Sequence, residues 1–599
     1  MCARRIDDYG YLADGRSGAL VGRDGSVDWW CPPRFDAPSV FARLLDDAGG
    51  HWWIRPAGEF RVERSYLDDT LVLRTVFTTE EGSVAVTDAL ALGHGRGHEI
   101  GRNSPSLLLR LVEGLTGRVP MVMSYAPHFE YGRVRAYLER RGQTVIGTAT
   151  GATLGMTASV PVDCHETTAS SLFTIGAGQR ESFSLAYWSS YREDPPVAPD
   201  VPASLAETVE GWHSWMAEHD YTGEHSDLVR RSTLLLVGLT YQPSGGVVAA
   251  ATTSVPVRPE GHDNYDYRYV WLRDFSLTLR MLSIAACPKE ADRLFCWLAE
   301  SIGDANLAPV PIMFGVEGER DLAERELGTL GEPGENDPVL LGNDAWHQRQ
   351  QDVLGQVLDA AWLLRRRLDP MPKPVRRMLR SLTDRAVETW RLPDSGMWEL
   401  RGEERHYLTA KLGCWIALDR AVRFDAVLGD PAEVARWAAV RDEIREAILR
   451  YGWNPELGAF TDAFESDRLD ASVLVLPLVG FISAADPRMR ATIERIEREL
   501  TTDGLVRRWP GDSAGFVICS FWLVGCLALL GEQDRADALF TRMVARANDL
   551  GLFAEQIDLR TGEQLGNFPQ AFSHIGLISA AWRLTSARTG RPTPITTVV

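Results

Sequence analysis

Long apolar runs are missing from this chain of 599 residues, although 45% of its residues are hydrophobic. No stretch of eighteen or more apolar residues occurs, whereas a membrane-spanning helix needs about twenty. The most apolar stretch, SVLVLPLVGFI at 472–482, is too short to span and contains a proline, so it predicts a buried helix. The first residues, MCARRIDDYGYLADG, lack the apolar core of a secretory signal. We therefore expect no membrane partner and a cytoplasmic location.

Cysteine and histidine patterns typical of disulfides or metal sites are also missing. The eight cysteines are scattered, and none forms a Cys-x-x-Cys pair. Several lie among apolar helix residues, which is typical of reduced thiols in a core. His347 and His406 have no third group at metal-ligand spacing, so we expect no metal site. The chain also lacks a Gly-x-Ser-x-Gly nucleophile elbow, and GVEGER at 315–320 lacks the strand and helix around a phosphate-binding loop.

Excess positive charge is absent as well. The formal net charge is −19, and no basic stripe offsets it, which argues against a nucleic-acid partner. This balance fits a protein that acts on a neutral or cationic ligand, and it fits equally a charge that only keeps the protein in solution. The charge therefore excludes a class of partner without identifying a substrate.

The first third of the chain has the pattern of β structure. Alternating or β-branched runs recur, such as TLVLRTVFTTEEGSVAVTDALAL at 70–92 and ESFSLAYWSSY at 181–191, with turn residues at the spacing of a sandwich. A proline-rich stretch at 193–204 is typical of a linker. We predict a β-sandwich domain at 1–210, a connecting segment at 211–224 and a second domain at 225–599.

A helical period of 3.6 residues begins near residue 225. Some segments are apolar on all sides, such as FVICSFWLVGCLALL at 516–530, and others carry a one-sided stripe, such as PAEVARWAAVRDEIREAILRYG at 431–452. This alternation predicts an inner ring of helices wrapped by an outer ring, an (α/α)6 toroid. The long loop at 304–346 is expected to line one mouth of the toroid. The twelve predicted helices start near residues 226, 271, 288, 347, 372, 405, 431, 468, 485, 514, 532 and 570.

A candidate sugar site lies in YDYRYVWLRDFSLTLRML at 265–282, where four aromatic residues precede Arg273 and Asp274. Aromatic faces, among them Trp271, pack against the apolar faces of a pyranose, while the arginine and the aspartate can hydrogen-bond its hydroxyls. The alternative is an ordinary helix start, with an acidic residue favouring the helix dipole and a neighbouring ion pair.

Glu399 is a candidate general acid. It follows Trp398 and precedes Arg405 and His406 in a loop that enters a helix. A general acid must hold its proton near neutral pH, and the adjacent indole can supply the apolar wall that this requires. The alternative is a surface glutamate paired with an arginine.

Glu555, in GLFAEQIDLRTGEQLGNFPQAFSHIGL at 551–577, is a candidate base. Its setting is Gly-rich and aromatic, and it lies just before a predicted helix. Asp558 and Glu563 are equally acidic neighbours, and position alone does not choose among the three.

Together these segments resemble glycoside hydrolase family 15, the family of glucoamylases and of bacterial and archaeal trehalases. The resemblance covers nearly the whole chain and begins with IDDYGYLADGRSGALVGRDGSVDWWCPPRFDAPSVFARLLDD at 6–47. VWLRDFSLTL is similar to the substrate-holding Arg-Asp motif, GMWELRGEERHY to the acid segment and AEQIDLRTGEQLGNFPQAFSHIGL to the base segment.

The resemblance implies a β-sandwich followed by an (α/α)6 barrel, and an inverting mechanism with Glu399 as acid and Glu555 as base. Carboxyl groups roughly 6.5–9.5 Å apart across one cleft are then expected. It implies that Arg273 and Asp274 hold the terminal glucose, and no metal or organic cofactor is required. The other candidate substrate-binding residues are Trp271, Trp398, Arg405 and His406.

Two departures bear on specificity. Relatives tend to carry an arginine-rich loop where this chain has GEPGENDPVLLGND at 331–344, and Gln356 stands where they often have a glutamate. The leading hypothesis is an exo-acting α-glucoside hydrolase that releases β-glucose from trehalose, maltooligosaccharides or isomalto-type sugars. The alternatives are an enzyme that hydrolyses or transfers an unusual α-glucoside, and a sugar-binding relative without turnover.

Overall fold

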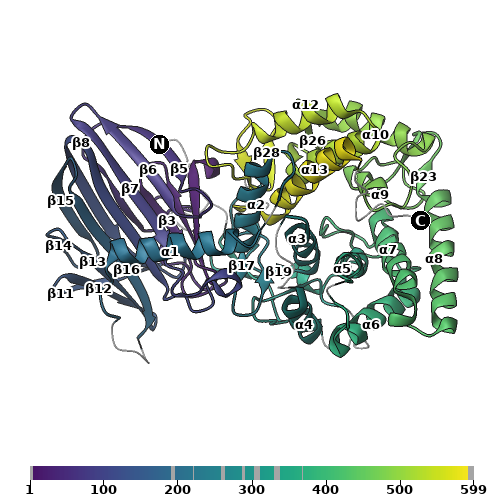
Figure 1. Cartoon of the computed structure of the whole chain (residues 1–599), viewed down its shortest axis with the longest axis horizontal. Coiled ribbons are helices and arrows are strands. Elements are labelled where there is room, and N and C mark those ends of the chain that lie inside the picture. Colours follow the sequence, from purple (N-terminus) through teal and green to yellow (C-terminus); the bar gives the residue numbers. More distant parts are fainter. Residues whose placement is uncertain are drawn as a thin grey trace.

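The computed structural model describes residues 5–190, 196–219, 221–257, 264–285, 291–302, 310–328, 338–366 and 368–590. A β domain formed by the first part of the chain lies beside a ring of helices (Figure 1). The predicted β-sandwich followed by an (α/α)6 barrel is confirmed.

Strand β8 (Leu107–Ala126) belongs to both sheets of the sandwich. Its first half pairs with β7 (Gly82–Leu90) and β16 (Arg180–Ser189), and its second half with β4 (His51–Pro56) and β15 (Ala169–Gly176). All of these pairs are antiparallel. The other strands of the two sheets are β1 Tyr9–Ala13, β2 Gly18–Gly22, β3 Ser26–Trp30, β5 Arg61–Tyr66, β6 Leu73–Thr79, β11 Tyr137–Arg141, β12 Thr144–Ala149, β13 Ala152–Ala158 and β14 Asp163–Cys164.

Burial separates the strands that face solvent from those that face the helices. Side chains in β4 alternate between buried and half-buried, as in a sheet with one covered face, whereas β1, β2 and β3 are buried throughout. Contacts with the helical part explain this: Tyr11 Oη donates to Gly238 O at 2.8 Å, and Trp29 Nε1 donates to Ala251 O at 3.0 Å.

Helix α1 (Val201–Met216) occupies part of the predicted connection between the domains. Its proline lies in the first turn, where the missing N–H costs nothing, and the Asp200 side chain caps the helix by accepting from Ala203 N. The end of the proline-rich stretch, 201–204, therefore lies in this helix, and the predicted connecting segment 211–224 begins inside it. The division of the chain at 210 and 225 stays a prediction.

Twelve α-helices between residues 226 and 589 of the described part alternate between an outer and an inner ring. The inner helices pack in a closed circle, α3–α5–α7–α9–α11–α13–α3, in which a short 3-10 turn (Ala471–Leu474) extends α9. The outer helices are α2 Ser226–Gly238, α4 Ala291–Ile302, α6 Lys373–Thr389, α8 Pro431–Tyr451, α10 Pro487–Leu500 and α12 Gln533–Val544. The inner helices are α3 Leu272–Ala285, α5 Asp352–Leu363, α7 Leu408–Phe424, α9 Val475–Leu478, α11 Val517–Leu529 and α13 Ala571–Thr589.

The predicted helices are matched one for one, although the start predicted near 288 lies outside the described residues. Helix α11 is apolar on nearly every side because inner helices pack both toward the barrel axis and against the outer ring. Its 13 residues are too few for a bilayer, and none of the described helices is long and apolar enough to cross one. Cys31, Cys414, Cys519 and Cys526 are free and buried in the core, whereas Cys2 and Cys287 lie outside the described residues.

Short strands form small sheets outside the sandwich: β9 (His128–Phe129) pairs with β10 (Val134–Arg135) in the β domain, and the others lie in the loops between the helices. These others are β17 Thr240–Tyr241, β18 Gly246–Val247, β19 Val270–Trp271, β20 Met313–Phe314, β21 Arg325–Glu326, β22 Leu340–Leu341, β23 Trp453–Asn454, β24 Ala459–Phe460, β25 Thr501–Thr502, β26 Leu505–Val506, β27 Ala514–Phe516, β28 Gln556–Asp558 and β29 Gln564–Leu565.

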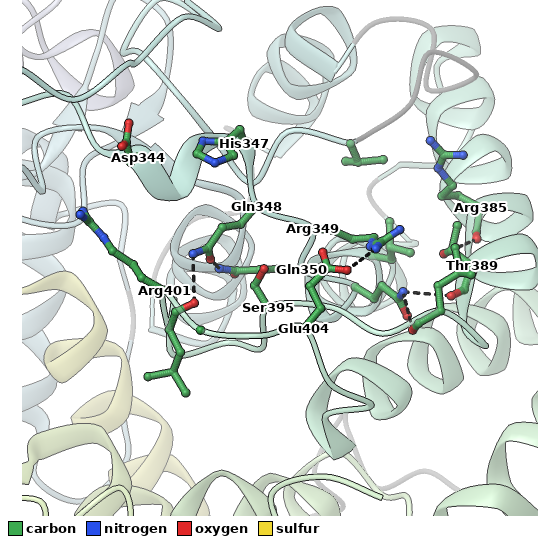
Figure 2. Close-up of a pocket in the computed structure, with 16 residues that line it drawn as sticks. Asp344, His347, Gln348, Arg349, Gln350, Arg385, Thr389, Ser395, Arg401 and Glu404 are labelled. Carbon is green, nitrogen blue, oxygen red and sulfur yellow. Dashed lines mark hydrogen bonds and ion pairs between the residues drawn. The ribbon is translucent and has the colours of Figure 1, made fainter.

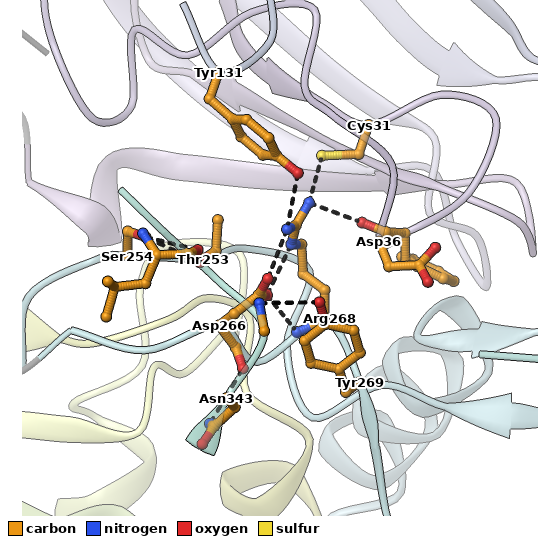
Figure 3. Close-up of polar contacts among 12 residues, drawn as sticks. Cys31, Asp36, Tyr131, Thr253, Ser254, Asp266, Arg268, Tyr269 and Asn343 are labelled. Carbon is orange, nitrogen blue, oxygen red and sulfur yellow. Dashed lines mark hydrogen bonds and ion pairs between the residues drawn. The ribbon is translucent and has the colours of Figure 1, made fainter. Parts of the chain in front are cut away.

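Arg268 joins the two domains through a fully buried ion pair. Its guanidinium binds both oxygens of Asp266, at 2.9 and 2.7 Å, and donates to Ala37 O at 2.9 Å and Tyr131 Oη at 3.0 Å in the β domain. Figure 3 shows Arg268 between these partners. Because Arg268, Asp266 and Tyr131 are buried, the pair fixes the chain just before α3 against the sandwich.

Arg268→Met is expected to destabilise the protein by about 3–5 kcal/mol, because Asp266 is left as an unpaired buried charge. The measurement is urea unfolding followed by tryptophan fluorescence. Arg498→Met is the matched control: the Arg498 side chain is 64% exposed and its pair with Glu499 should contribute no more than about 1 kcal/mol. Equal effects of the two substitutions would contradict the anchoring role of Arg268.

Candidate active site

The short strand β19 positions Trp271, Arg273 and Asp274 at the barrel mouth. Trp271 ends β19, which pairs with β20, and Arg273 and Asp274 fill the first turn of α3 directly afterwards. All three side chains are buried. The segment does start a helix, with Asp274 in the first turn and Arg273 paired with Asp352, so the sugar-binding role of these residues stays a prediction.

Glu399 lies in the loop before α7 in a left-handed backbone conformation, with φ of +57°. Such a conformation is costly for a residue with a side chain and is commonest at functional sites. Its carboxylate accepts from Trp271 Nε1 at 2.8 Å and from Arg273 Nη2 at 3.1 Å. The side chain is 21% exposed, so it is open to a cavity on one side only.

Burial raises the pKa of Glu399 to about 7. The Arg273 guanidinium opposes that rise, and the carboxyl groups of Asp274 and Glu555 add to it. Burial likewise raises the pKa of Asp274 to about 6, again opposed by Arg273. Glu399 can therefore hold a proton at neutral pH, as the sequence analysis required of a general acid.

Glu555 immediately precedes β28 and is only 6% exposed. Its carboxylate accepts from Tyr267 Oη at 3.4 Å, Gln556 Nε2 at 3.3 Å and Gln570 Nε2 at 3.3 Å. Burial raises the pKa of Glu555, while the charge of Arg508 and these three donors favour the ionised form. Arg508 and the three hydrogen-bond donors thus support the negative charge of this carboxylate.

Asp558 and Glu563, the other two acids of the Glu555 loop, have different surroundings. Asp558 accepts from the backbone N–H groups of Arg560 and Thr561 and so holds a turn. The Glu563 side chain is 42% exposed. Geometry therefore separates Glu555 from both neighbours, a choice that position in the sequence could not make.

Glu399 and Glu555 line the same two connected compartments. The inner compartment, of about 60 Å³, is also lined by Trp271, Arg273 and Asp274. The outer compartment, of about 330 Å³, is lined by residues from the loops around the barrel mouth: Val257, Tyr265, Asn343, Ala345, Leu400, Arg401, Trp509 and Gln556. The residues shared by both are Tyr267, Trp398, Glu399, Arg508 and Glu555, so the two carboxyl groups lie where the compartments meet.

Trp398 forms an aromatic wall at this junction. Its Nε1 donates to both oxygens of Asp470 at 3.1 Å, which fixes the indole, and its ring lies 5.1 Å from that of Phe516. Arg508, which lines both compartments, lies over the Trp509 ring at 4.4 Å and pairs with Asp512 at 2.8 Å.

A larger cavity of about 810 Å³ adjoins the outer compartment through Leu400 and Arg401, which line both. Figure 2 shows Gln348 and Gln350 on its wall. Gln348 Nε2 donates to Leu400 O at 3.3 Å, and Gln350 Oε1 accepts from Arg273 Nη1 at 3.2 Å. This cavity therefore borders the carboxyl pair without containing it.

Two of the candidate substrate-binding residues are not brought to the compartments. Arg405 pairs with Asp462 at 3.1 Å, and His406 is exposed and stacks against Phe464 with ring centroids 6.2 Å apart. The exposed segment 401–406 carries the chain away from Glu399 before α7 begins. Proximity in sequence to the acid was thus no guide to proximity in space.

Sequence reasoning missed four residues that surround Glu555. Tyr267 belongs to the aromatic run already noted, so its pattern was visible although its partner was not. Gln556 and Gln570 lie in the base segment itself, 1 and 15 positions after Glu555, but nothing in their pattern marked them as its partners. Arg508 comes from a separate loop that only the barrel brings close to Glu555. Of the 304–346 loop, Asn343 and Ala345 do line the mouth, whereas 303–309 and 329–337 lie outside the described residues.

A search of the described ranges for three or more histidine, cysteine, aspartate or glutamate side chains able to hold a metal ion finds no such group. The chemistry available from the described side chains is that of two carboxyl groups, one with a pKa near neutrality, in a cavity with aromatic walls and arginine donors. That combination suits acid and base catalysis on a sugar acetal.

Sequence comparisons agree with this chemistry. A sequence model of glycosyl hydrolases family 15 matches residues 223–582, and a model of a trehalase-like N-terminal domain matches residues 2–178. The protein is a glycoside hydrolase. The chain belongs to glycosyl hydrolases family 15.

Individual relatives match over nearly the whole length. A trehalase of Mycolicibacterium smegmatis is 37% identical, covering 96% of this chain and 90% of the relative. A trehalase of Thermoplasma volcanium is 30% identical, covering 99% and 95%. A bacterial glucoamylase solved in complex with acarbose has the same fold, with a TM-score of 0.72 at 14% identity over 97% of this chain and 94% of the other.

Proposed function

We propose that the protein is an exo-acting, inverting α-glucoside hydrolase, with Glu399 as general acid, Glu555 as general base and trehalose as the first candidate substrate. The observation that carries this proposal is the position of both carboxyl groups at the junction of the inner and outer compartments. A glycosidic bond spanning that junction lies within reach of both.

The inner compartment supports exo action because its lining suits one terminal glucose. Trp271 and Tyr267 offer aromatic faces to the ring, and Arg273 and Asp274 offer charged partners to its hydroxyls. Phe572, Met397 and Phe516 bound the compartment with apolar surface, so it ends within the barrel. A chain end can enter such a site, whereas the middle of a polysaccharide cannot.

Proton transfer follows from the different surroundings of the two acids. Glu399 holds a proton up to a pH of about 7 and delivers it to the leaving oxygen. Glu555, favoured as the anion by Arg508 and three hydrogen-bond donors, accepts a proton from the water that attacks C1 from the opposite face. The C1–oxygen bond breaks as the C1–water bond forms, and β-glucose is released. Since the acids influence each other, the measured pKa values belong to the pair.

Two relatives named trehalase, each aligned over nearly the whole chain, support trehalose as substrate. The outer compartment is polar and suits a second glucose, with Asn343, Arg401 and Gln556 available to its hydroxyls. Malto- and isomalto-oligosaccharides are the competing substrates within the same mechanism.

A second candidate is an α-glucoside with a larger leaving group, hydrolysed or transferred at the same acids. The cavity of about 810 Å³ that shares Leu400 and Arg401 with the outer compartment supports it, because a long aglycone could continue into that space. A carbohydrate-binding relative without turnover is a weaker candidate, since binding alone does not need two buried acids at one junction.

Glu399→Gln and Glu555→Gln are each expected to lower kcat by about 10²–10⁴-fold, because each removes one proton-transfer group while preserving shape. The measurement is glucose release from trehalose, with circular dichroism to confirm folding. Glu563→Gln is the matched control, since it changes an exposed acid of the same loop and should retain full activity. Full activity in either Glu399→Gln or Glu555→Gln would remove that residue from the mechanism.

Trehalose, maltose, isomaltose and soluble starch supplied separately should give the highest kcat/KM with trehalose. Each trehalose should first give one β-glucose from the attacked ring and one α-glucose as the leaving group. Proton NMR during the first minutes distinguishes the anomers before they equilibrate. Initial release of α-glucose without β-glucose from trehalose would exclude inversion, and a preference for starch would exclude the trehalose assignment while leaving the two acids in place.

Trp271→Phe is expected to move the alkaline fall of kcat/KM to higher pH. The indole N–H stabilises the ionised form of Glu399, so its loss raises the pKa of that carboxyl further, and a general acid remains active for as long as it is protonated. The measurement is the pH profile of kcat/KM for trehalose.

Trp398→Phe is the control for that experiment. It makes the same substitution in the same cavity, yet its N–H donates to Asp470 instead of Glu399. Its alkaline limb should stay where the wild-type limb lies. An equal shift in both variants would show that the indole hydrogen bond does not set the pKa of Glu399.

A further inference from the structure

A second, separate cavity lies along the barrel among the inner helices. Its volume is about 70 Å³, which exceeds the roughly 10–15 Å³ that one water needs. This axial cavity borders the inner compartment only through side chains that line both, namely Arg273, Met397 and Phe572. Most of its wall is apolar, yet three arginines reach it, namely Arg273, Arg280 and Arg583.

Arg583, on α13, is the least satisfied of these arginines. It is 3% exposed, and its Nη2 donates to Leu478 O at 2.7 Å. Within the described residues its Nε and Nη1 have no hydrogen-bond partner. Burial and the nearby charge of Arg280 lower the pKa of Arg583 to about 9, so the group is still charged at neutral pH.

The neighbouring carboxylates are already engaged. Asp359 accepts from Arg280 Nη1 at 2.9 Å and from Arg420 Nε at 2.8 Å, and Arg420 also pairs with Asp419. Arg280, Arg420 and Arg583 carry three positive charges. Asp359 and Asp419 carry two negative charges. One positive charge therefore remains uncompensated beside the cavity.

Unpartnered atoms on the cavity wall are mostly donors. Among the described residues, Nε of Arg273, Arg280 and Arg583 and Nη1 of Arg583 lack partners, against one acceptor, Oδ1 of Asp352. A surplus of charged N–H donors around an enclosed space is the environment that an anion requires, and a buried unpaired charge is strongly unfavourable without one.

We propose that this axial cavity binds one small monovalent inorganic anion, such as chloride, between Arg583 and Arg280. The single uncompensated charge sets the valence, and the volume of about 70 Å³ admits a halide with accompanying water. The site is distinct from the catalytic one, and its test does not depend on activity.

The experiment measures the thermal midpoint of the full-length protein while chloride replaces methanesulfonate at constant ionic strength. An anion that binds only the folded state raises the midpoint in a saturable way, by about 2–4 °C at high occupancy. Arg583→Leu removes the uncompensated charge and should abolish the response. Arg498→Leu, which changes an exposed arginine, should keep it.

Gln356→Glu provides a second variant that retains Arg583. Gln356 lines the same cavity, so a carboxylate there supplies the missing negative charge and should also abolish the chloride response. Crystals soaked in bromide should show one anomalous peak in the axial cavity of the wild type and none in Arg583→Leu. A wild-type midpoint independent of chloride, a response that persists in Arg583→Leu, or bromide absent from this cavity would each overturn the proposal.

Discussion

The contact between Arg273 and Glu399 is the interaction on which the organisation of the site depends. One guanidinium joins three parts of the barrel: it starts on α3, pairs with Asp352 at the beginning of α5 at 3.0 Å, and donates to Glu399 in the loop before α7 at 3.1 Å. Its charge is balanced within the barrel, because an unpaired arginine at this depth would be strongly unfavourable. The same pairing moderates the pKa of Glu399, which burial alone would raise further.

The β domain contributes to the site without lining the compartments. Asp266 and Arg268 face the sandwich, and Tyr267 between them faces Glu555. This division follows from an extended chain, in which successive side chains point to opposite sides. Anchoring Arg268 in the sandwich, with Asp266 paired to it, therefore orients Tyr267 between them toward Glu555.

Much of the fold could be predicted because the buried and exposed faces of helices produce a periodic pattern of apolar and charged residues in the sequence. Inner helices such as α11 are apolar on nearly all sides and outer helices such as α8 carry exposed charge, so alternation of the two patterns predicted the double ring. Helix α1 was missed because prolines mark both linkers and first turns, and only the capping contact of Asp200 distinguishes them.

The site was less predictable than the fold. Glu399 and Glu555 were selected through family motifs, since the local sequence of each also suits an exposed loop. Arg405 and His406 follow Glu399 closely, yet the left-handed turn at Glu399 and the exposed segment after it lead them elsewhere. Arg508 lies 47 positions before Glu555 and influences its pKa only because two loops meet at the barrel mouth. Such contacts depend on tertiary structure and produce no periodic pattern in the sequence.

Charge along the barrel axis connects the two cavities. Arg273 lines both, so its guanidinium is influenced by Glu399 on one side and by the contents of the axial cavity on the other. Electrostatic interactions weaken slowly with distance where water is excluded, so a negative charge held beside Arg583 and Arg280 would offset part of the positive potential that favours ionised Glu399. The pKa of the acid would then rise with occupancy of the axial cavity. The protonation state of Glu399, the proposed acid, is in this sense a property of the whole column of buried arginines and carboxylates, of which Arg273 is the member that lines both cavities.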